Sequence, residues 1–280
     1  MKKQIQIGGS ISGVIATGPY QNLKPQFSWY ETIEDCDFDD NKIESREKEI
    51  YEKLTAMLKE AEQTAVAERI RRERKDMRFL KSPNTGKLLP SVTSIINYDS
   101  DFFVTPDELV QYASQGNIID GRVKHYIESG MWEDAKNLKE LWSDIVIITR
   151  GSLKLELNVG SFPGFLEKYP INDMVVGKRF FNDIDEYTGE PDFIGVPGFS
   201  GAEKIKTIFD IKRTSDKIKN GMQLSAYCRH YNIEQGIIIQ INGKTKQGYS
   251  KPIIYDETTL DGYFEMFSKK QSDFKKRYNI

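Results

Sequence analysis

The chain has 280 residues, enough to bury a substantial apolar interior as one large domain or as a core with an appendage. A hydrophobic content of 38% and a charged content of 29% are typical of a folded globular protein and exclude a disordered chain. The formal net charge of -2 excludes an inference of nucleic-acid binding from overall basicity, so a binding surface requires local clusters of Lys and Arg.

Cysteine content and the amino-terminal residues indicate the compartment. Cys36 and Cys228 are too few for a disulfide framework or a zinc ribbon, which favours a reducing cytoplasm. The stretch MKKQIQIGGSISGVIATG lacks the continuous apolar core of a signal peptide, and no apolar run approaches the length of a membrane span. We therefore expect a cytoplasmic protein with no membrane partner.

The amino-terminal third predicts short strands followed by one long helix. Residues 1–35 mix β-branched residues with Gly, Pro and Ser, whereas residues 41–79 are rich in Glu, Lys, Arg and Ala and contain no Gly or Pro. Ile43, Ile50 and Met57 recur at seven-residue spacing. The repeat is not sustained, which favours a projecting or packing helix over a dimer zipper.

The end of this helix, ERIRRERKDMRFLK (68–81), is the most basic segment of the chain. Acids lie among its arginines, so the segment can form ion pairs along a solvated helix face. The alternative is that the arginines contact phosphate groups. The turn SPNTGKL (82–88) follows, and we place a boundary there between an appendage of residues 1–87 and a core of residues 88–280.

The core is predicted to combine helices and strands. Helices are expected after TPDEL, with Thr105 as N-cap, then over 117–131 with a stop near Gly130, over 220–231 and over about 257–277. Strands are expected at 144–149, 153–157, 174–181, 191–196, 206–212, 236–242 and 251–255, with NDIDEYTGE as a hairpin connection. This order predicts an α/β or α+β fold with a mixed central sheet flanked by helices.

Two of these strands carry charged residues at their ends. Asp210 and Lys212 are two apart in a strand, so they project from one face while Phe209 and Ile211 project from the other. Asp192 begins the preceding strand, and its carboxylate would approach Asp210 if the two strands pair. Two carboxylates at such a distance repel each other unless a cation lies between them.

This arrangement predicts a divalent metal held by Asp192 and Asp210. Oxygen ligands favour Mg²⁺ or Mn²⁺, and the scarcity of Cys and His argues against zinc. Lys212 beside the metal would orient water and offset charge on a phosphate, which suits phosphodiester hydrolysis. The alternative is a surface salt bridge between Asp210 and Lys212, with Asp192 as a turn residue, because D-x-K alone is a common triplet.

The order of motifs resembles that of the PD-(D/E)xK nuclease superfamily, in particular its RecB-like and phage exonuclease branch. GEPDFIG, TIFDIK and MQLSAY follow one another as in that branch, and GRVKHYIE (121–128) resembles its first motif. LPSVTSII precedes them as it does in phage and mitochondrial exonuclease relatives. The resemblance covers about residues 88–277 and implies a restriction-endonuclease-like core.

The resemblance implies roles for individual residues. His125, Asp192 and Asp210 would ligate the metal together with the main-chain carbonyl of Ile211, and Lys212 would be the catalytic lysine. Without the other motifs, the histidine would be interpreted as an interior residue of an apolar-striped helix.

Three further residues follow from the same resemblance. Gln223 and Tyr227 are four apart, so they share a helix face, and they match a Q-x-x-x-Y element that positions the DNA strand and the lysine. Glu128 lies one turn from His125 and would reach a second metal. The alternative is a helix surface pair and an ordinary solvated acid.

The function implied by the resemblance is that of a metal-dependent deoxyribonuclease, an exonuclease acting at the ends of single- or double-stranded DNA. Its setting would be phage or bacterial replication, recombination or repair, in the host cytoplasm if a phage encodes it. A replication or recombination protein, or further copies of the chain, would be its partners. The alternative is a catalytically inactive nuclease-fold module that binds nucleic acid or protein, although such a module usually loses one of Asp192, Asp210 and Lys212.

Overall fold

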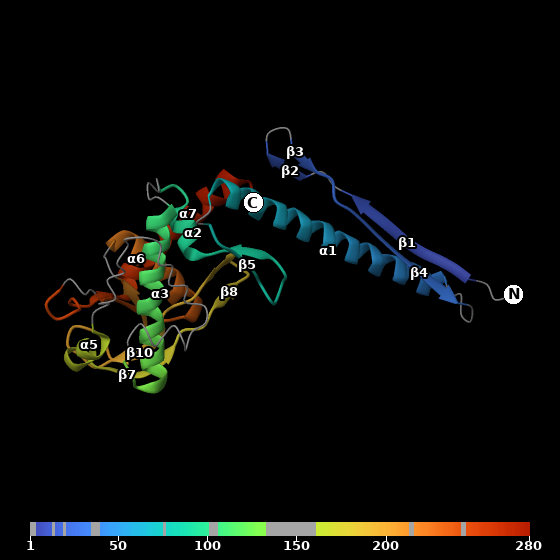
Figure 1. The fold of residues 1–280 in the computed structure, drawn as a ribbon. Coiled ribbons are helices and arrows are strands. Elements are labelled where there is room, and N and C mark those ends of the chain that lie inside the picture. Colours follow the sequence, from blue (N-terminus) through green and yellow to red (C-terminus); the bar gives the residue numbers. More distant parts are fainter. Residues whose placement is uncertain are drawn as a thin grey trace. The chain divides into compact units, whose positions relative to one another are not determined.

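The computed structural model describes residues 4–12, 15–18, 21–34, 40–74, 77–100, 106–132, 161–212, 216–241 and 245–280. The chain divides into two compact units (Figure 1). Unit 1 comprises Met1–Ser91, Asp183–Glu186 and Lys275–Ile280, and unit 2 comprises Val92–Asn182 and Tyr187–Phe274. The strands expected at 144–149 and 153–157 and the N-cap Thr105 lie outside the described residues.

The elements of unit 1 are one long helix and short pairs of antiparallel strands. They are β1 (Gln4–Ser12), β2 (Ile15–Gly18), β3 (Gln21–Leu23), β4 (Gln26–Glu34), α1 (Asp40–Glu73), β5 (Phe79–Lys81) and β6 (Leu88–Pro90). β1 pairs with β4, β2 with β3, and β5 with β6.

The elements of unit 2 are a five-stranded sheet, a hairpin and several helices. In chain order they are α2 (Val92–Asn97), α3 (Pro106–Ser129), α5 (Phe162–Lys168), β7 (Ile171–Val176), β8 (Phe180–Asn182), β9 (Tyr187–Gly189), β10 (Phe193–Pro197), β11 (Thr207–Lys212), α6 (Lys217–Tyr231), β12 (Gln235–Gln240), β13 (Ile253–Tyr255) and α7 (Glu257–Tyr278), whose last residues belong to unit 1. Among the helices of the described ranges, none combines the length and the apolar character that a membrane crossing requires.

Part of the seven-residue series in α1 is used for packing within unit 1. Ile50 and Leu54 are buried, and Ile43, Ile11 of β1 and Phe27 of β4 pack against them, whereas Met57 is exposed. Apolar side chains on one side of the helix thus cover the strand pair, which is the packing role that the interrupted repeat favours.

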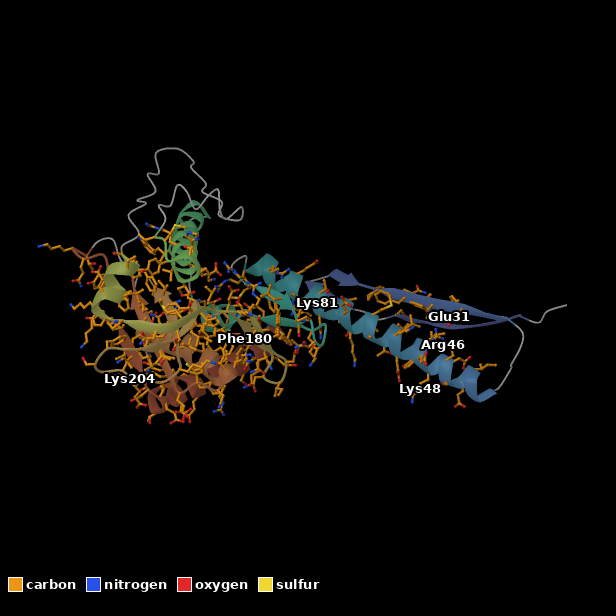
Figure 2. The ribbon with its side chains drawn as sticks, turned by 90° about the horizontal axis from the view of Figure 1, so that it is seen from below. Glu31, Arg46, Lys48, Lys81, Phe180 and Lys204 are labelled. Atoms are coloured by element: carbon orange, nitrogen blue, oxygen red, sulfur yellow. The ribbon has the colours of Figure 1, made fainter. Side chains whose placement is uncertain are left out.

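A charged pair joins the same two elements. Arg46 of α1 donates from Nε and Nη2 to the carboxylate of Glu31 in β4, at 2.7 and 2.6 Å, and the two side chains lie next to each other in Figure 2. These hydrogen bonds lower the pKa of Glu31. A fork of two donors on one carboxylate fixes the geometry of the pair, although its exposure limits its contribution to stability.

Two arginines of the basic segment make internal contacts. Arg69 donates to the main-chain oxygen of Tyr278 at 2.6 Å, and Arg71 donates to that of Phe79 at 2.8 Å. Both guanidinium groups therefore hold neighbouring chain segments of unit 1 in place.

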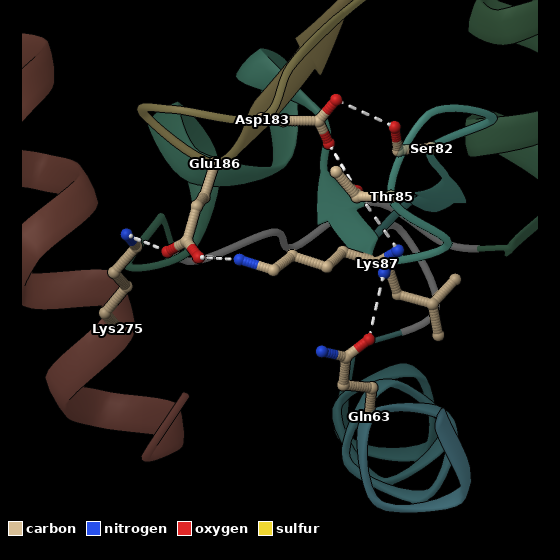
Figure 3. A network of polar contacts seen from close by, with 8 residues as sticks. Gln63, Ser82, Thr85, Lys87, Asp183, Glu186 and Lys275 are labelled. Atoms are coloured by element: carbon tan, nitrogen blue, oxygen red, sulfur yellow. Dashed lines mark hydrogen bonds and ion pairs between the residues drawn. The ribbon is translucent and has the colours of Figure 1, made fainter. Parts of the chain in front are cut away.

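The turn between β8 and β9 belongs to unit 1 and is held by two acids (Figure 3). Asp183 accepts a hydrogen bond from Oγ1 of Thr85 at 2.7 Å, and this bond, the largest cause, lowers its pKa. Glu186 accepts from Lys87 at 3.2 Å and from Lys275 at 2.6 Å. One carboxylate thereby joins segments that are distant in the sequence.

The sheet of unit 2 has the strand order β13-β12-β11-β10-β7. β11 and β12 are parallel, and the other neighbours are antiparallel. The expectation of a mixed central sheet flanked by helices is confirmed. The single strand expected at 174–181 is instead the end of β7 and the start of β8, because residues 177–179 leave the ladder.

Helices pack on both faces of this sheet. On one face, α3 and α5 bury an aromatic and aliphatic cluster whose members include Ile119, Val123, Phe162, Phe165, Phe193, Phe209, Ile237 and Ile239. Gly236 of β12 points to the other face, since side chains alternate, and a Cβ there would contact Leu224 of α6. α6 therefore covers β11 and β12 opposite α3.

α3 differs from the sequence expectation in its extent. The helix after TPDEL and the helix over 117–131 are one continuous helix through Gly116. A glycine costs only about 1 kcal/mol inside a helix, which packing of the apolar stripe offsets. The expected stop is confirmed: Gly130 has φ of 74°, and its N–H donates to the main-chain oxygen of Tyr126 at 2.8 Å.

Close backbone packing at Gly177 tests the fold next to the strand end that carries Asp192. The Gly177 N–H donates to the main-chain oxygen of Asp192 at 3.0 Å, and a Cβ at Gly177 would lie 1.8 Å from the Pro191 oxygen. We expect Gly177→Ala to lower the free energy of unfolding by about 2 kcal/mol, because the backbone must move apart. Gly116→Ala, with no atom within 4 Å of the added Cβ, should raise it by about 0.5–1 kcal/mol. Urea unfolding measures both, and an unchanged midpoint for Gly177→Ala would contradict the packing described.

Candidate active site

The pairing of β10 with β11 brings two acids together. Phe193 is the partner of Phe209 in this antiparallel ladder, so the register continued by one residue sets Asp192 opposite Asp210. Oδ2 of Asp192 also accepts a hydrogen bond of 2.5 Å from the N–H of Ile211. The sequence expectation that these strands are neighbours is confirmed.

Lys212 forms an ion pair with Asp210 on the same face of β11. The carboxylate of Asp210 is almost fully buried, with 2% of its side chain exposed, whereas 25% of the Lys212 side chain is exposed. Burial alone would lower the pKa of Lys212, but the charges of Asp210 and Asp192 raise it. Phe209 lies in the core on the opposite face, and Ile211 packs against that core. The alternative of a surface salt bridge does not fit the burial of Asp210.

A third carboxylate, that of Asp120 in α3, approaches the same place. Its Oδ1 is buried and has no hydrogen-bond partner, while Oδ2 lies 3.0 Å from Nζ of Lys124. Burial, followed by the charges of Asp210 and Asp120, raises the pKa of Asp192 well above its ordinary value. Burial likewise raises the pKa of Asp120, which is close enough to Asp192 for the two carboxyl groups to hydrogen-bond if one is protonated.

Basic side chains surround this group of acids. Nζ of Lys124 lies 3.0 Å from Oε1 of Glu190 as well as 3.0 Å from Asp120. Arg179 donates to Oε2 of Glu190 at 2.8 Å. Because Lys124 is shared between two carboxylates, it offsets only part of the negative charge of Asp120.

Gln223 and Tyr227 extend the site on α6. Nε2 of Gln223 donates to the Tyr227 hydroxyl at 2.7 Å, and both side chains are buried. The pKa of Tyr227 is raised by burial and then by the negative charge of Asp210. These two residues share a helix face, as their spacing indicates, and the buried face excludes the alternative of a surface pair.

The structure gives His125 a contact within α3 and leaves Glu128 exposed, so neither expected role as a metal ligand is tested. Nε2 of His125 lies 3.2 Å from Oγ of Ser129, and Glu128 is exposed. At about 100° per residue, His125 is about 140° around α3 from Asp120 and nearly opposite the stripe that contains Ile119 and Val123. The stripe faces the core, so the histidine faces away from it.

Asp120 is the residue beside these acids that the sequence analysis did not select, although the sequence contained a signal for it. It lies at the flank of the apolar stripe, directly before the GRVKHYIE motif, and one turn before Lys124. An acid at the border of a buried helix face is costly unless it has a partner. The angular positions of the two residues around the helix favour Asp120 over His125 as the residue near the acids.

The donor chemistry of the acids fits a hard divalent cation. Oδ1 of Asp120 and Oδ2 of Asp210 are buried without a hydrogen-bond partner, although the latter contacts the Lys212 ammonium as an ion pair. Carboxylate oxygens of this kind are ligands of Mg²⁺ and Mn²⁺. Within the described ranges, no three His, Cys, Asp or Glu side chains are arranged closely enough to hold a metal ion in the present conformation.

Comparison with known proteins gives little further information. No protein-family model and no curated protein matches the chain. A solved structure titled "Crystal structure of SSO0001" aligns with 61% of this chain and 89% of its own, at 16% identity and a TM-score of 0.25. A similarity at that level carries no inference about fold or function.

Repulsion among the three aspartates predicts a stabilising substitution. We expect Asp192→Asn to raise the free energy of unfolding of the metal-free protein by about 1 kcal/mol at pH 7, because an amide oxygen still accepts the Ile211 N–H while one negative charge is removed. The folded pKa of Asp192 lies above 3.8, so the repulsion is absent below that pH and grows as the pH rises through the folded value.

Denaturant unfolding at several pH values checks this expectation. Glu167→Gln, which removes an exposed carboxylate on α5, is the matched control and should change the free energy of unfolding by less than about 0.5 kcal/mol. A loss of stability in Asp192→Asn at pH 7, or an equal gain at pH 3, would contradict the described electrostatics.

Proposed function

We propose that unit 2 is a divalent-metal-dependent nuclease that hydrolyses phosphodiester bonds of DNA, acting as an exonuclease at strand ends. The observation that carries this proposal is the convergence of Asp192, Asp210 and Lys212 at one end of paired strands, with a third carboxylate from α3 beside them. The resemblance of the motif order to the PD-(D/E)xK superfamily supports it. Action on DNA, and at ends, depends on that resemblance alone.

The metal would be held by Asp192 and Asp210, with Asp120 as a third carboxylate in place of the expected His125 and Glu128. A bound Mg²⁺ or Mn²⁺ would supply positive charge and Lewis acidity for hydrolysis of the phosphodiester. The N–H of Ile211 fixes one oxygen of Asp192, so the other oxygen is directed away from the strand backbone. That contact gives the amide of Ile211 a positioning role in addition to the expected role of its carbonyl.

Lys212 is the residue of this chain suited to stabilise the reaction electrostatically. Its ammonium lies against the buried carboxylate of Asp210 and remains partly exposed to an incoming strand. The raised pKa keeps it protonated at neutral pH, so it presents positive charge to a phosphate oxygen on which negative charge develops.

Gln223 and Tyr227 act as positioning residues in this proposal. The amide of Gln223 donates to the Tyr227 hydroxyl, which fixes the orientation of both side chains beside Asp210. The setting in phage or bacterial replication, recombination or repair, and self-association or a partner protein from those processes, remain parts of the same proposal.

Substitution of the lysine tests the proposed reaction. We expect Lys212→Ala to reduce hydrolysis of linear DNA in Mg²⁺ or Mn²⁺ by at least about 100-fold, because the charge facing the phosphate is lost. Lys204→Ala is the control, since Lys204 (labelled in Figure 2) is an exposed lysine that precedes the opposite end of β11. The assay compares linear with circular DNA, which tests the requirement for ends, and Mg²⁺ or Mn²⁺ with EDTA, which tests the requirement for metal. Equal rates for Lys212→Ala and the parent protein would contradict the proposal.

Metal binding distinguishes Asp120 from His125. We expect Asp120→Asn to weaken Mn²⁺ binding by about tenfold, because one negative donor is lost, and His125→Ala to leave it within about twofold. Isothermal titration calorimetry without DNA measures both affinities. If His125→Ala weakens binding and Asp120→Asn does not, the expectation from the motif is right and the assignment from the helix angle is wrong.

A further inference from the structure

A pocket of about 200 Å³, lined mostly by residues with polar or charged side chains, lies beside the candidate active site in unit 2. Its lining includes Thr93, Asn97, Lys212, Lys219, Asn220 and Gln223. Lys212 and Gln223 also contact the acid and the tyrosine of the site, so a group bound in the pocket would lie next to the reacting phosphate. Among the residues that the structure describes, the lining of the pocket is polar apart from Ile96 and includes no aromatic side chain.

Lys219 gives the pocket a positive charge whose contacts, among the described residues, are with neutral groups. Its Nζ donates to Oδ1 of Asn97 at 2.9 Å and to Oγ of Ser100 at 3.1 Å, and both acceptors are neutral. An ammonium group has three donors, so one remains for a further acceptor. The two neutral contacts fix the position of the group without compensating its charge.

Asn220 adds a polar group that lacks an acceptor. The residue is 5% exposed, and its amide Nδ2 is buried without a hydrogen-bond partner. A buried donor without an acceptor costs about 1–3 kcal/mol, which an anionic ligand with several oxygens would recover.

The remaining charge at the pocket is Asp216. Its carboxylate accepts the main-chain N–H of Lys219 at 3.0 Å as the N-cap of α6, and the residue is exposed. The 15-residue helix that it caps adds partial positive charge at the same end. Lysine, amide and helix end together favour an anion with several acceptor oxygens.

We propose that this pocket binds a backbone phosphate of the substrate strand, adjacent to the phosphate that is hydrolysed. The inference rests on the proposed nuclease function and adds to it a subsite that holds the strand through its phosphates and not through its bases. Lys219 is a substrate-positioning residue, and its removal should affect binding more than the rate at saturation.

Binding of a single-stranded DNA oligonucleotide in EDTA tests the subsite without hydrolysis. We expect Lys219→Met to weaken binding by about fivefold at moderate salt and to reduce the slope of log K against log salt by about 0.7, the value for one phosphate contact on a single strand. Lys219→Arg should retain the slope, because it retains the charge. Lys217→Met is the matched control: Lys217 is exposed on the same helix and does not line the pocket. It should bind within about twofold of the parent protein.

A neutral linkage in place of one DNA phosphate tests the contact with Lys219 by changing the DNA and not the protein. We expect a single methylphosphonate, moved along the oligonucleotide, to weaken parent binding by about fivefold at one position and to have no effect at that position in Lys219→Met. With Mg²⁺ present, Lys219→Met should raise KM and leave kcat within about twofold.

The outcomes separate the subsite from the reaction. If Lys219→Met and Lys217→Met weaken binding equally, or if every methylphosphonate affects the parent protein and Lys219→Met alike, the subsite is overturned while hydrolysis by the parent still supports the nuclease. If the Lys219-dependent pattern is present but no DNA is hydrolysed in Mg²⁺ or Mn²⁺, the nuclease function is overturned and the pocket stands as a phosphate-binding site.

Discussion

The site of unit 2 depends on how two carboxylates, Asp192 and Asp210, are kept facing each other in a mostly apolar interior. The register of the paired strands, continued by one residue, sets the two acids opposite each other, so surrounding groups must offset their repulsion. The Ile211 N–H and the Lys212 ammonium do so from the strand itself. Because both come from β11, the strand that carries one acid also carries the groups that stabilise the pair.

The second element of this balance comes from α3. Asp120 adds negative charge where two acids already meet, and Lys124 cannot neutralise it fully because it also contacts Glu190. The result is a charge arrangement that favours an added cation, with Lys212 in the position nearest to Asp210. In the proposed function, Asp210 would bind the divalent ion, and the Lys212 ammonium, which has no lone pair to donate, would remain beside the carboxylate without binding the metal.

The periodicity of strands and helices allowed part of the candidate site to be predicted from the sequence. Two-residue alternation placed Asp210 and Lys212 on one face, and four-residue spacing placed Gln223 beside Tyr227, because both relations are local. The sequence analysis left the pairing of the strands that carry Asp192 and Asp210 as a condition, and the structure shows that they pair. The choice of Asp120 over His125 was not made, since it depends on the rotation of a helix about its axis and on packing against a distant sheet. The joining of two expected helices into one likewise depended on packing, which outweighs the local cost of a glycine.

The composition of unit 1 has a consequence for the order of folding during synthesis. Glu186 and Lys275 both belong to this unit, although most of its residues precede position 92. A ribosome makes α1 and its strands early, but Glu186 is translated only after the first segment of unit 2, and Lys275 only after the second. The last contacts of the amino-terminal segment can therefore form only after residues far along the chain have been synthesised. Because these contacts join residues distant in the sequence, we expect the last step in the folding of unit 1 to be slow.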